Sequence, residues 1–104
     1  MEVIFRVSGD ILISCIKGEV DHHSAMPLRQ AIDKSMKAFG CSDLVLDFSG
    51  VEFMDSSGIG LIMGRYRMMG MRGDCIQATG VNSYIEKLLH LSGVYKFVEI
   101  CGEV

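Results

Sequence analysis

Two neighbouring hydroxyls in the stretch FMDSSGIGL, residues 53–61, are the side chains of this sequence best placed to do chemistry. Ser56 and Ser57 follow the carboxylate of Asp55 and precede an apolar pattern at helical spacing. A serine in such a position can cap the helix, act as a nucleophile or accept a phosphate. The residues around the two serines decide among these three uses.

The segment from Asp55 to Gly58 is expected between the end of a strand and the start of a helix, where α/β sheets commonly bind ligands. Backbone N–H groups in a first helical turn are unpaired, and the helix dipole favours negative charge there. A phosphoserine, with a charge of about -1.5 to -2, suits this position. Gly58 and Gly60 would leave the backbone open to another protein's active site. The simpler interpretation is that Asp55 or Ser56 caps the helix and the glycines allow tight packing.

A serine enzyme is disfavoured, because the G-x-S-x-G motif is absent and the apolar Met54 and Ile59 lie beside the serines. The candidate bases are the histidines His22, His23 and His90. Four cysteines stand far apart, without a C-x-x-C pair or a zinc-type histidine pair, so we expect reduced packing residues. The sequence therefore predicts no enzyme, no catalytic residue, no metal site and no cofactor.

Length and charge narrow the class of partner. The chain has 104 residues and a formal net charge of -3, which predicts one domain and gives no electrostatic reason to bind nucleic acid. The amino-terminal residues lack the basic start and apolar run of a secretory signal. The apolar stretch GIGLIMG is too short to cross a bilayer. We expect a cytoplasmic protein whose partner is another protein or a small ligand, with no membrane contact.

Patterns of apolar and turn-forming residues predict an α/β fold with the order β-β-α-β-α-β-α-β. The strands are expected over residues 2–7, 11–17, 44–48, 75–79 and 95–101. The helices are expected from the cap Ser24 to Gly40, from Ser57 to Gly70, and from the cap Asn82 or Ser83 to Gly93. Short links between alternating elements predict right-handed crossovers onto a mixed, mostly parallel sheet, with the first strand antiparallel at or near its edge.

Over nearly its whole length, the chain closely resembles the STAS-domain anti-sigma factor antagonists. The resemblance is carried by the segments IKGEVDHHSA, LVLDFSGVEFMDSSGIGLIMGRYRMM and YIEKLLHLSGVYKFVEI. It implies a single STAS domain over residues 1–104, with helices packed on the sheet. Family members usually carry a further helix after the last strand, whereas only Gly102, Glu103 and Val104 follow Cys101, so that helix is expected to be absent.

The resemblance also implies a regulatory switch. In this family a D-S-S-G segment is phosphorylated on its second serine, which implies Ser57 here. The sporulation members are the most similar, which implies an unphosphorylated form that binds an anti-sigma factor serine kinase with bound ATP or ADP and releases sigma F. Phosphorylation would switch binding off, and a serine phosphatase would restore it. The chain would be a monomer and a positive regulator of sporulation transcription.

The family segment G-E-[LV]-D-H-H matches residues 18–23, which the resemblance implies lie near the phosphorylated serine. The residues expected to contact the partner are Asp21, His22, His23, Asp55, Ser56, Ser57, Gly58 and Gly60. For Asp21 the simpler alternative is an exposed turn aspartate, and for His22 and His23 it is a polar pair in a loop. Three arginines are expected to face solvent or the partner: Arg65, Arg67 and Arg72.

Two other functions stay open. An antagonist acting on a stress-response sigma factor would share the fold and the switch, although the paired histidines after Asp21 favour the sporulation members. A ligand-binding STAS module of a transport or lipid-trafficking system would instead bind a lipid or an anion and would need no kinase.

Overall fold

The predicted alternation of strands and helices is realised in a computed structural model that describes residues 1–102. The strands are β1 (Glu2–Ser8), β2 (Ile11–Val20), β3 (Asp43–Met54), β4 (Ile76–Val81) and β5 (Glu99–Gly102). The helices are α1 (Ala25–Phe39), α2 (Ser56–Met68) and α3 (Ser83–Ser92), with short 3-10 turns at η1 (Gly73–Cys75) and η2 (Val94–Lys96). The predicted order of strands and α-helices is confirmed.

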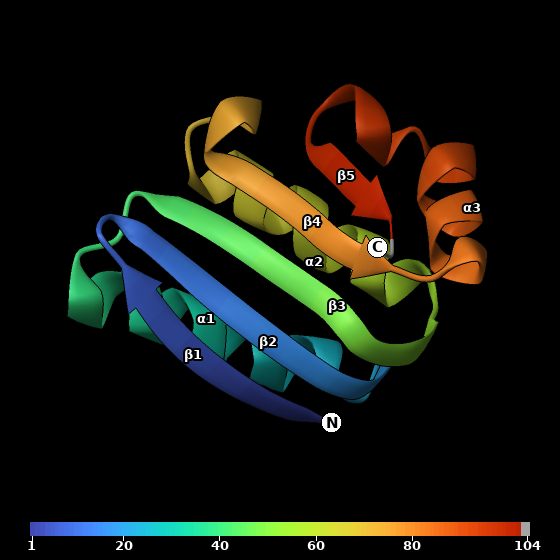
Figure 1. The fold of residues 1–104 in the computed structure, drawn as a ribbon, viewed down its shortest axis with the longest axis horizontal. Helices are drawn as coiled ribbons and strands as arrows, with labels where there is room; N and C mark the ends of the chain where they lie inside the picture. Colours follow the sequence, from blue (N-terminus) through green and yellow to red (C-terminus); the bar gives the residue numbers. More distant parts are fainter. Residues whose placement is uncertain (103–104) are drawn as a thin grey trace.

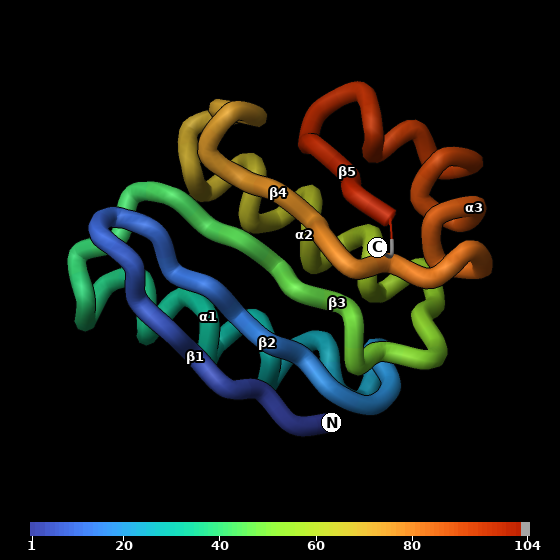
Figure 2. Tube along the Cα trace, viewed as in Figure 1, coloured from blue at the N-terminus to red at the C-terminus, as the bar shows by residue number. Residues whose placement is uncertain are grey.

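The five strands form one sheet in the order β1-β2-β3-β4-β5, which is also their order along the chain. β1 pairs with β2 in antiparallel fashion at the edge, as predicted, and the other neighbouring strands are parallel. Parallel neighbours need crossover connections, and α1 and α2 provide two of them. Both helices lie side by side against the same face of the sheet (Figures 1 and 2).

β3 differs most from its predicted extent. The sequence predicts a strand over 44–48 followed by a loop, whereas β3 continues to Met54. Val51 and Met54 are buried in this second half, and β2 stays paired beside it through two irregularities in register. A Cβ atom at Gly50 would lie 2.9 Å from the carbonyl oxygen of Ile16, so only glycine lets the strands approach this closely. What looks like a turn signal is part of a bulged strand.

The last part of the chain also differs from expectation. The strand predicted over 95–101 begins only at Glu99, because the residues before it form η2 after the left-handed Gly93. Asn82, and not Ser83, caps α3, since its side chain accepts a hydrogen bond from the N–H of Ile85 at 2.8 Å. The expected absence of a helix after the last strand concerns residues 103–104 and beyond, outside the described residues.

The core lies between the helices and the inner face of the sheet. Each helix presents two fully or nearly fully buried aliphatic side chains: Leu28 and Ile32 from α1, Leu61 and Ile62 from α2, and Ile85 and Leu89 from α3. The sheet contributes the alternating buried residues Leu12, Ile16, Leu44, Leu46, Phe48, Ile76 and Ala78. This burial is what positions the two helices that carry the site.

Arg65 corrects one sequence-based expectation, because it faces neither solvent nor a free surface. Its side chain is 3% exposed, and its Nη1 donates to the Asp33 carboxylate of α1 and, at 3.4 Å, to the carbonyl oxygen of Arg29. Burial lowers the pKa of the Arg65 guanidinium, and the Asp33 carboxylate opposes that shift. The buried pair thus ties α2 to α1.

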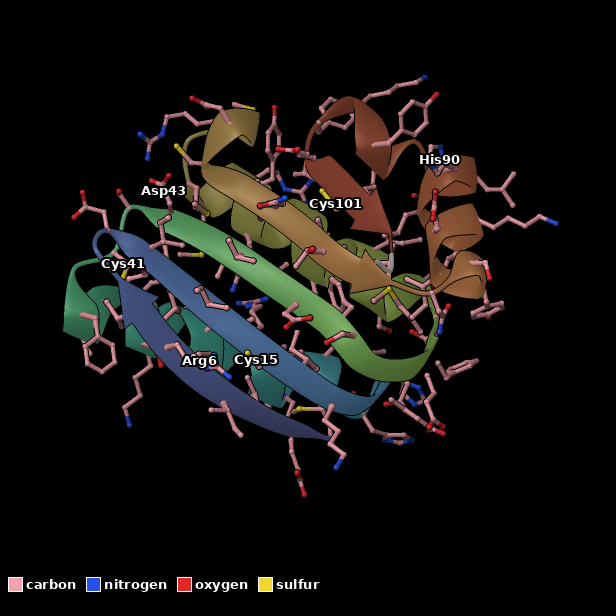
Figure 3. All side chains as sticks on the ribbon, in the orientation of Figure 1. Arg6, Cys15, Cys41, Asp43, His90 and Cys101 are labelled. Carbon is pink, nitrogen blue, oxygen red and sulfur yellow. The ribbon has the colours of Figure 1, made fainter. Side chains whose placement is uncertain are left out.

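The four cysteines are free thiols, as expected. Figure 3 shows Cys15, Cys41 and Cys101 on separate parts of the fold. Within residues 1–102, no helix combines the length and the apolar character needed to span a bilayer.

Substitutions of the buried ion pair are expected to destabilise the protein unequally. Asp33→Ala leaves a buried cation without its carboxylate, which costs about 3 kcal/mol or more. Arg65→Met costs less, because methionine fills the space and Asp33, whose side chain is 29% exposed, can be hydrated. Urea unfolding followed by circular dichroism measures both losses. Equal losses, or a larger loss for Arg65→Met, would contradict the burial of the Arg65 guanidinium against a hydrated Asp33.

Candidate functional site

The ends of two parallel strands bring the predicted site together. Val20, the last residue of β2, pairs with Met54, the last residue of β3. The N–H of Asp55 donates to the carbonyl oxygen of Val20 at 3.1 Å. The loop after β2 therefore lies beside the start of α2, at the lower right of Figure 1, and the expected nearness of residues 18–23 to the serines is confirmed.

Asp55 caps α2. Its backbone is extended and its Oδ1 accepts the N–H of Ser57 at 2.8 Å, while its carbonyl oxygen accepts the N–H of Gly58 at 3.0 Å. The helix begins at Ser56, one residue before the predicted start. Because the aspartate supplies the cap, neither serine hydroxyl is needed for this purpose.

The two serines differ in exposure. Ser56 is exposed and Ser57 is half-buried. Within residues 1–102 the Ser57 side chain makes no hydrogen bond, since only its backbone N–H is engaged by the cap. Ser57 therefore presents an unengaged hydroxyl in the first turn of α2, where the dipole and the backbone N–H groups favour added negative charge.

Asp21 and Ser24 hold the neighbouring loop by reciprocal hydrogen bonds. The Asp21 carboxylate accepts the N–H groups of His23 at 2.9 Å and Ser24 at 3.0 Å, and the Ser24 Oγ accepts the N–H of Asp21 at 3.0 Å. The Ser24 hydroxyl also donates to the carbonyl oxygen of Glu19 at 2.8 Å. Ser24 stands at the N-cap position of α1, as predicted, but its side chain makes no capping hydrogen bond to the helix and instead joins Asp21 in ordering the turn before α1.

The same contacts affect the ionisation of Asp21. The hydrogen bond from the backbone N–H of Ser24 is the main cause that lowers the pKa of this carboxyl below its ordinary value, with the N–H of His23 acting in the same direction. Asp21 therefore stays charged as it orders the loop. Asp21 is half-buried and its carboxylate accepts backbone N–H groups. This is consistent with a structural turn residue and also with a residue that shapes a contact surface.

The two glycines of the site are not equivalent. A Cβ atom at Gly58 would overlap the side chain of Met54, which is fully buried, so Gly58 is a packing position. The prediction that Gly58 leaves the backbone open is therefore wrong. A Cβ atom at Gly60 would have no atom within 4 Å. Of these two glycines, Gly60 is the one that leaves the surface of α2 bare.

A groove opens between α1 and α2 at this bare surface. It has a volume of about 220 Å³ and is open to solvent on one side. We call it the α1–α2 groove and define it by the residues that line it: His22, Ala25, Met26, Arg29, Ser57, Gly60 and Leu61. Three of the predicted contact residues, His22, Ser57 and Gly60, therefore share one cavity.

The two neighbouring histidines line different cavities. Their ring centroids lie 3.9 Å apart with the ring planes tilted by 40°, yet only His22 of the two lines the α1–α2 groove. His23 lines a neighbouring hollow with Asp21 and Ser24. Among the described residues no hydrogen bond joins His22 to Ser57, so the site resembles a presented acceptor hydroxyl more than an activated nucleophile.

Sequence reasoning missed Met26 and Arg29. Met26 is 51% exposed and Arg29 is exposed, and both face the groove from α1. Because Leu28 points to the core, helical spacing places Met26 and Arg29 on the surface of the helix, and the sequence could have indicated this. Helical spacing could not reveal that this part of the surface faces Ser57.

Comparisons with known proteins agree with this geometry. The family model described as STAS domain matches residues 2–104. The chain is 36% identical over 86% of its length to the anti-sigma F factor antagonist of Paenibacillus polymyxa, covering 77% of that protein. It is 26% identical over 85% of its length to the anti-sigma-B factor antagonist of Bacillus subtilis, covering 79% of that protein.

A solved structure shares the fold. The anti-sigma factor antagonist SpoIIAA in its unphosphorylated form superposes with a TM-score of 0.80 at 23% identity, covering 95% of this chain and 87% of that one. The likeness confirms the predicted arrangement of a mixed, mostly parallel sheet with helices packed on it.

Alanine at the two glycines is expected to change stability in opposite directions. Gly58→Ala forces the buried Met54 to move, which costs about 1 to 3 kcal/mol. Gly60→Ala meets open space and gains about 0.5 to 1 kcal/mol, because alanine favours the helix. Thermal unfolding of both variants provides the measurement, and a loss at Gly60 as large as that at Gly58 would show that the groove is not open there.

Proposed function

The chain belongs to the STAS domain family, and we propose that it is an anti-sigma factor antagonist that a kinase switches off at Ser57. In its unphosphorylated form it binds an anti-sigma factor that is also a serine kinase carrying ATP or ADP, and so releases the sigma factor. The similarity to an anti-sigma F factor antagonist over 86% of the chain supports sigma F and a positive role in sporulation transcription.

The observation that carries this proposal is the position of Ser57. Its hydroxyl is not used by the cap, because the Asp55 carboxylate takes that place, and it lines an open groove at the start of a helix. A kinase can reach such a hydroxyl without unfolding the helix, and the phosphate gains a favourable place in the helix dipole. A hydroxyl engaged in capping or packing would not be available in this way.

The partner surface extends from the groove to the loop before α1. We propose that it includes the residues predicted from the sequence: Asp21, His22, His23, Asp55, Ser56, Ser57, Gly58 and Gly60. Asp55 and Gly58 contribute by holding Ser57 in place, the first through the cap and the second through packing on Met54. Gly60 keeps the groove open.

Electrostatics alone is enough to run the switch. A hundredfold loss of affinity corresponds to about 2.7 kcal/mol. Repulsion between two unit charges about 5 Å apart, at an effective dielectric constant near 20, is worth roughly 3 kcal/mol. A phosphate on Ser57 that faces acidic groups or a bound nucleotide phosphate of the kinase therefore needs no refolding to release the partner.

The remaining parts of the proposal follow from this role. Residues 1–104 form one cytoplasmic, monomeric STAS domain with no catalytic residue and no cofactor of its own. A serine phosphatase removes the phosphate and returns the protein to its binding form. No contact with nucleic acid or a membrane is part of the cycle.

Phosphate transfer identifies the serine. Incubation with the cognate kinase and ATP is expected to add one phosphate to the parent protein and to Ser56→Ala, and none to Ser57→Ala. Intact mass spectrometry followed by peptide mapping measures the modification, with no lipid or anion added. Ser56→Ala is the matched control, because it removes the neighbouring hydroxyl at the same helix end. Labelling that is lost in Ser56→Ala and kept in Ser57→Ala would contradict the assignment.

Binding and folding are expected to respond differently to the phosphate. Ser57→Ala should keep its affinity for the kinase, whereas Ser57→Asp and the phosphorylated protein should lose about a hundredfold or more, since the added charge is repelled. The melting temperature of the phosphorylated protein should not fall, because the helix dipole tolerates the charge. Calorimetric titration and thermal unfolding measure the two effects. A large drop in melting temperature would point to refolding instead of repulsion.

The identity of the sigma factor is tested separately. Release of sigma F from a purified complex, measured in transcription assays, is expected on addition of the unphosphorylated protein. Release of a stress-response sigma factor alone would assign the chain to the other branch of antagonists.

A further inference from the structure

Arg29 carries a free positive charge at the wall of the α1–α2 groove. Its side chain is exposed, and among residues 1–102 it takes part in no ion pair. Asp33, one turn further along α1, is already paired with Arg65. The contact between Arg29 and Arg65 uses the backbone carbonyl oxygen of Arg29, so it leaves the guanidinium unengaged.

The groove has room for a phosphate between Ser57 and Arg29. Both residues line the same cavity of about 220 Å³. The neighbouring turn of α2 does not obstruct this space, since a Cβ atom at Gly60 would have no atom within 4 Å. A phosphoryl group on the Ser57 hydroxyl can extend into the groove without displacing backbone. The Arg29 side chain, which makes no hydrogen bond or ion pair within residues 1–102, is free to turn toward this space.

We propose that the Arg29 guanidinium forms an ion pair with the phosphate of phosphorylated Ser57 across the α1–α2 groove. The phosphate then occupies the groove that binds the partner. His22 lines the same cavity. The inference rests on the proposed function for the event that adds the phosphate. The contact itself follows from the shared cavity and the free guanidinium.

This contact adds a second way in which phosphorylation ends binding. Before modification, the Arg29 guanidinium is available to a carboxylate of the partner. After modification, the same guanidinium is paired within the chain and the phosphate fills the groove. Repulsion of the partner and loss of its binding surface then act together, and the planar fork of arginine suits this phosphate contact.

The experiment uses the full chain with phosphoserine inserted at position 57 during translation by a phosphoserine-specific suppressor transfer RNA, so no kinase is required. The second ionisation of the phosphate is followed by phosphorus NMR as a function of pH. In the parent, the ionisation constant is expected to be at least about threefold larger than in Arg29→Gln, because a neighbouring cation stabilises the dianion. Arg29→Lys should keep part of this difference, since it keeps the charge and loses the fork.

Arg67→Gln is the matched control. It removes the same charge from an exposed arginine of α2 that does not line the groove, and it is expected to titrate like the parent. Equal titration of the parent and Arg29→Gln would overturn the proposal, as would an equal effect of Arg67→Gln. Circular dichroism verifies folding, which Arg29→Gln should preserve because only the backbone of this residue is used in the fold.

The two proposals fail in different ways. If the kinase does not label Ser57, the proposed function fails while the titration result stands. If labelling succeeds and the titrations are equal, only the contact with Arg29 fails. The Nε–Hε resonance of Arg29 gives a second measurement, since it should move on phosphorylation while that of Arg67 stays in place.

Discussion

The ion pair between Arg65 and Asp33 is the contact on which the site depends, because it ties α2 to α1 one turn beyond the groove residues Leu61 and Arg29. Removing a guanidinium from water is costly, and the cost is recovered only if a carboxylate lies in the right position. An aliphatic contact would tolerate sliding of one helix along the other, whereas a buried charge does not. The pair thus contributes more to the relative position of the helices than to stability as such.

The parallel pairing of β2 and β3 provides the second constraint. Because both strands end at the same edge, Val20 and Met54 lie side by side and the N–H of Asp55 can reach the carbonyl oxygen of Val20. Two aspartates then order the two chain segments that leave this edge. Asp21 holds the loop before α1, and Asp55 holds the start of α2. The site is built mainly from backbone contacts, which leaves the Ser57 side chain free.

This construction suits a switch that works through charge. The rigid parts, which are the caps, the packed Gly58 and the buried ion pair, do not involve the Ser57 hydroxyl. A phosphate can therefore be added without breaking a contact of the unmodified protein. The half-buried Ser57 and the exposed Gly60 and Arg29 line a solvent-open groove, in which an added charge interacts at short range with its neighbours. In the proposed switch, stability and signalling thus depend on different side chains.

The sequence by itself determined the order of the elements, the hairpin, the glycine ends of α1 and α3 and, to within one residue, the start of α2, because these depend on residues close together in the chain. It also indicated Ser57 through the register of the family resemblance. The tertiary structure alone decided the long bulged half of β3, the use of the Ser24 hydroxyl in the turn before α1 and not in capping the helix, and the burial of Arg65. It also decided that Met26 and Arg29 face Ser57. These features depend on which surfaces meet across the fold, and local spacing carries no information about the partner of an exposed or charged side chain.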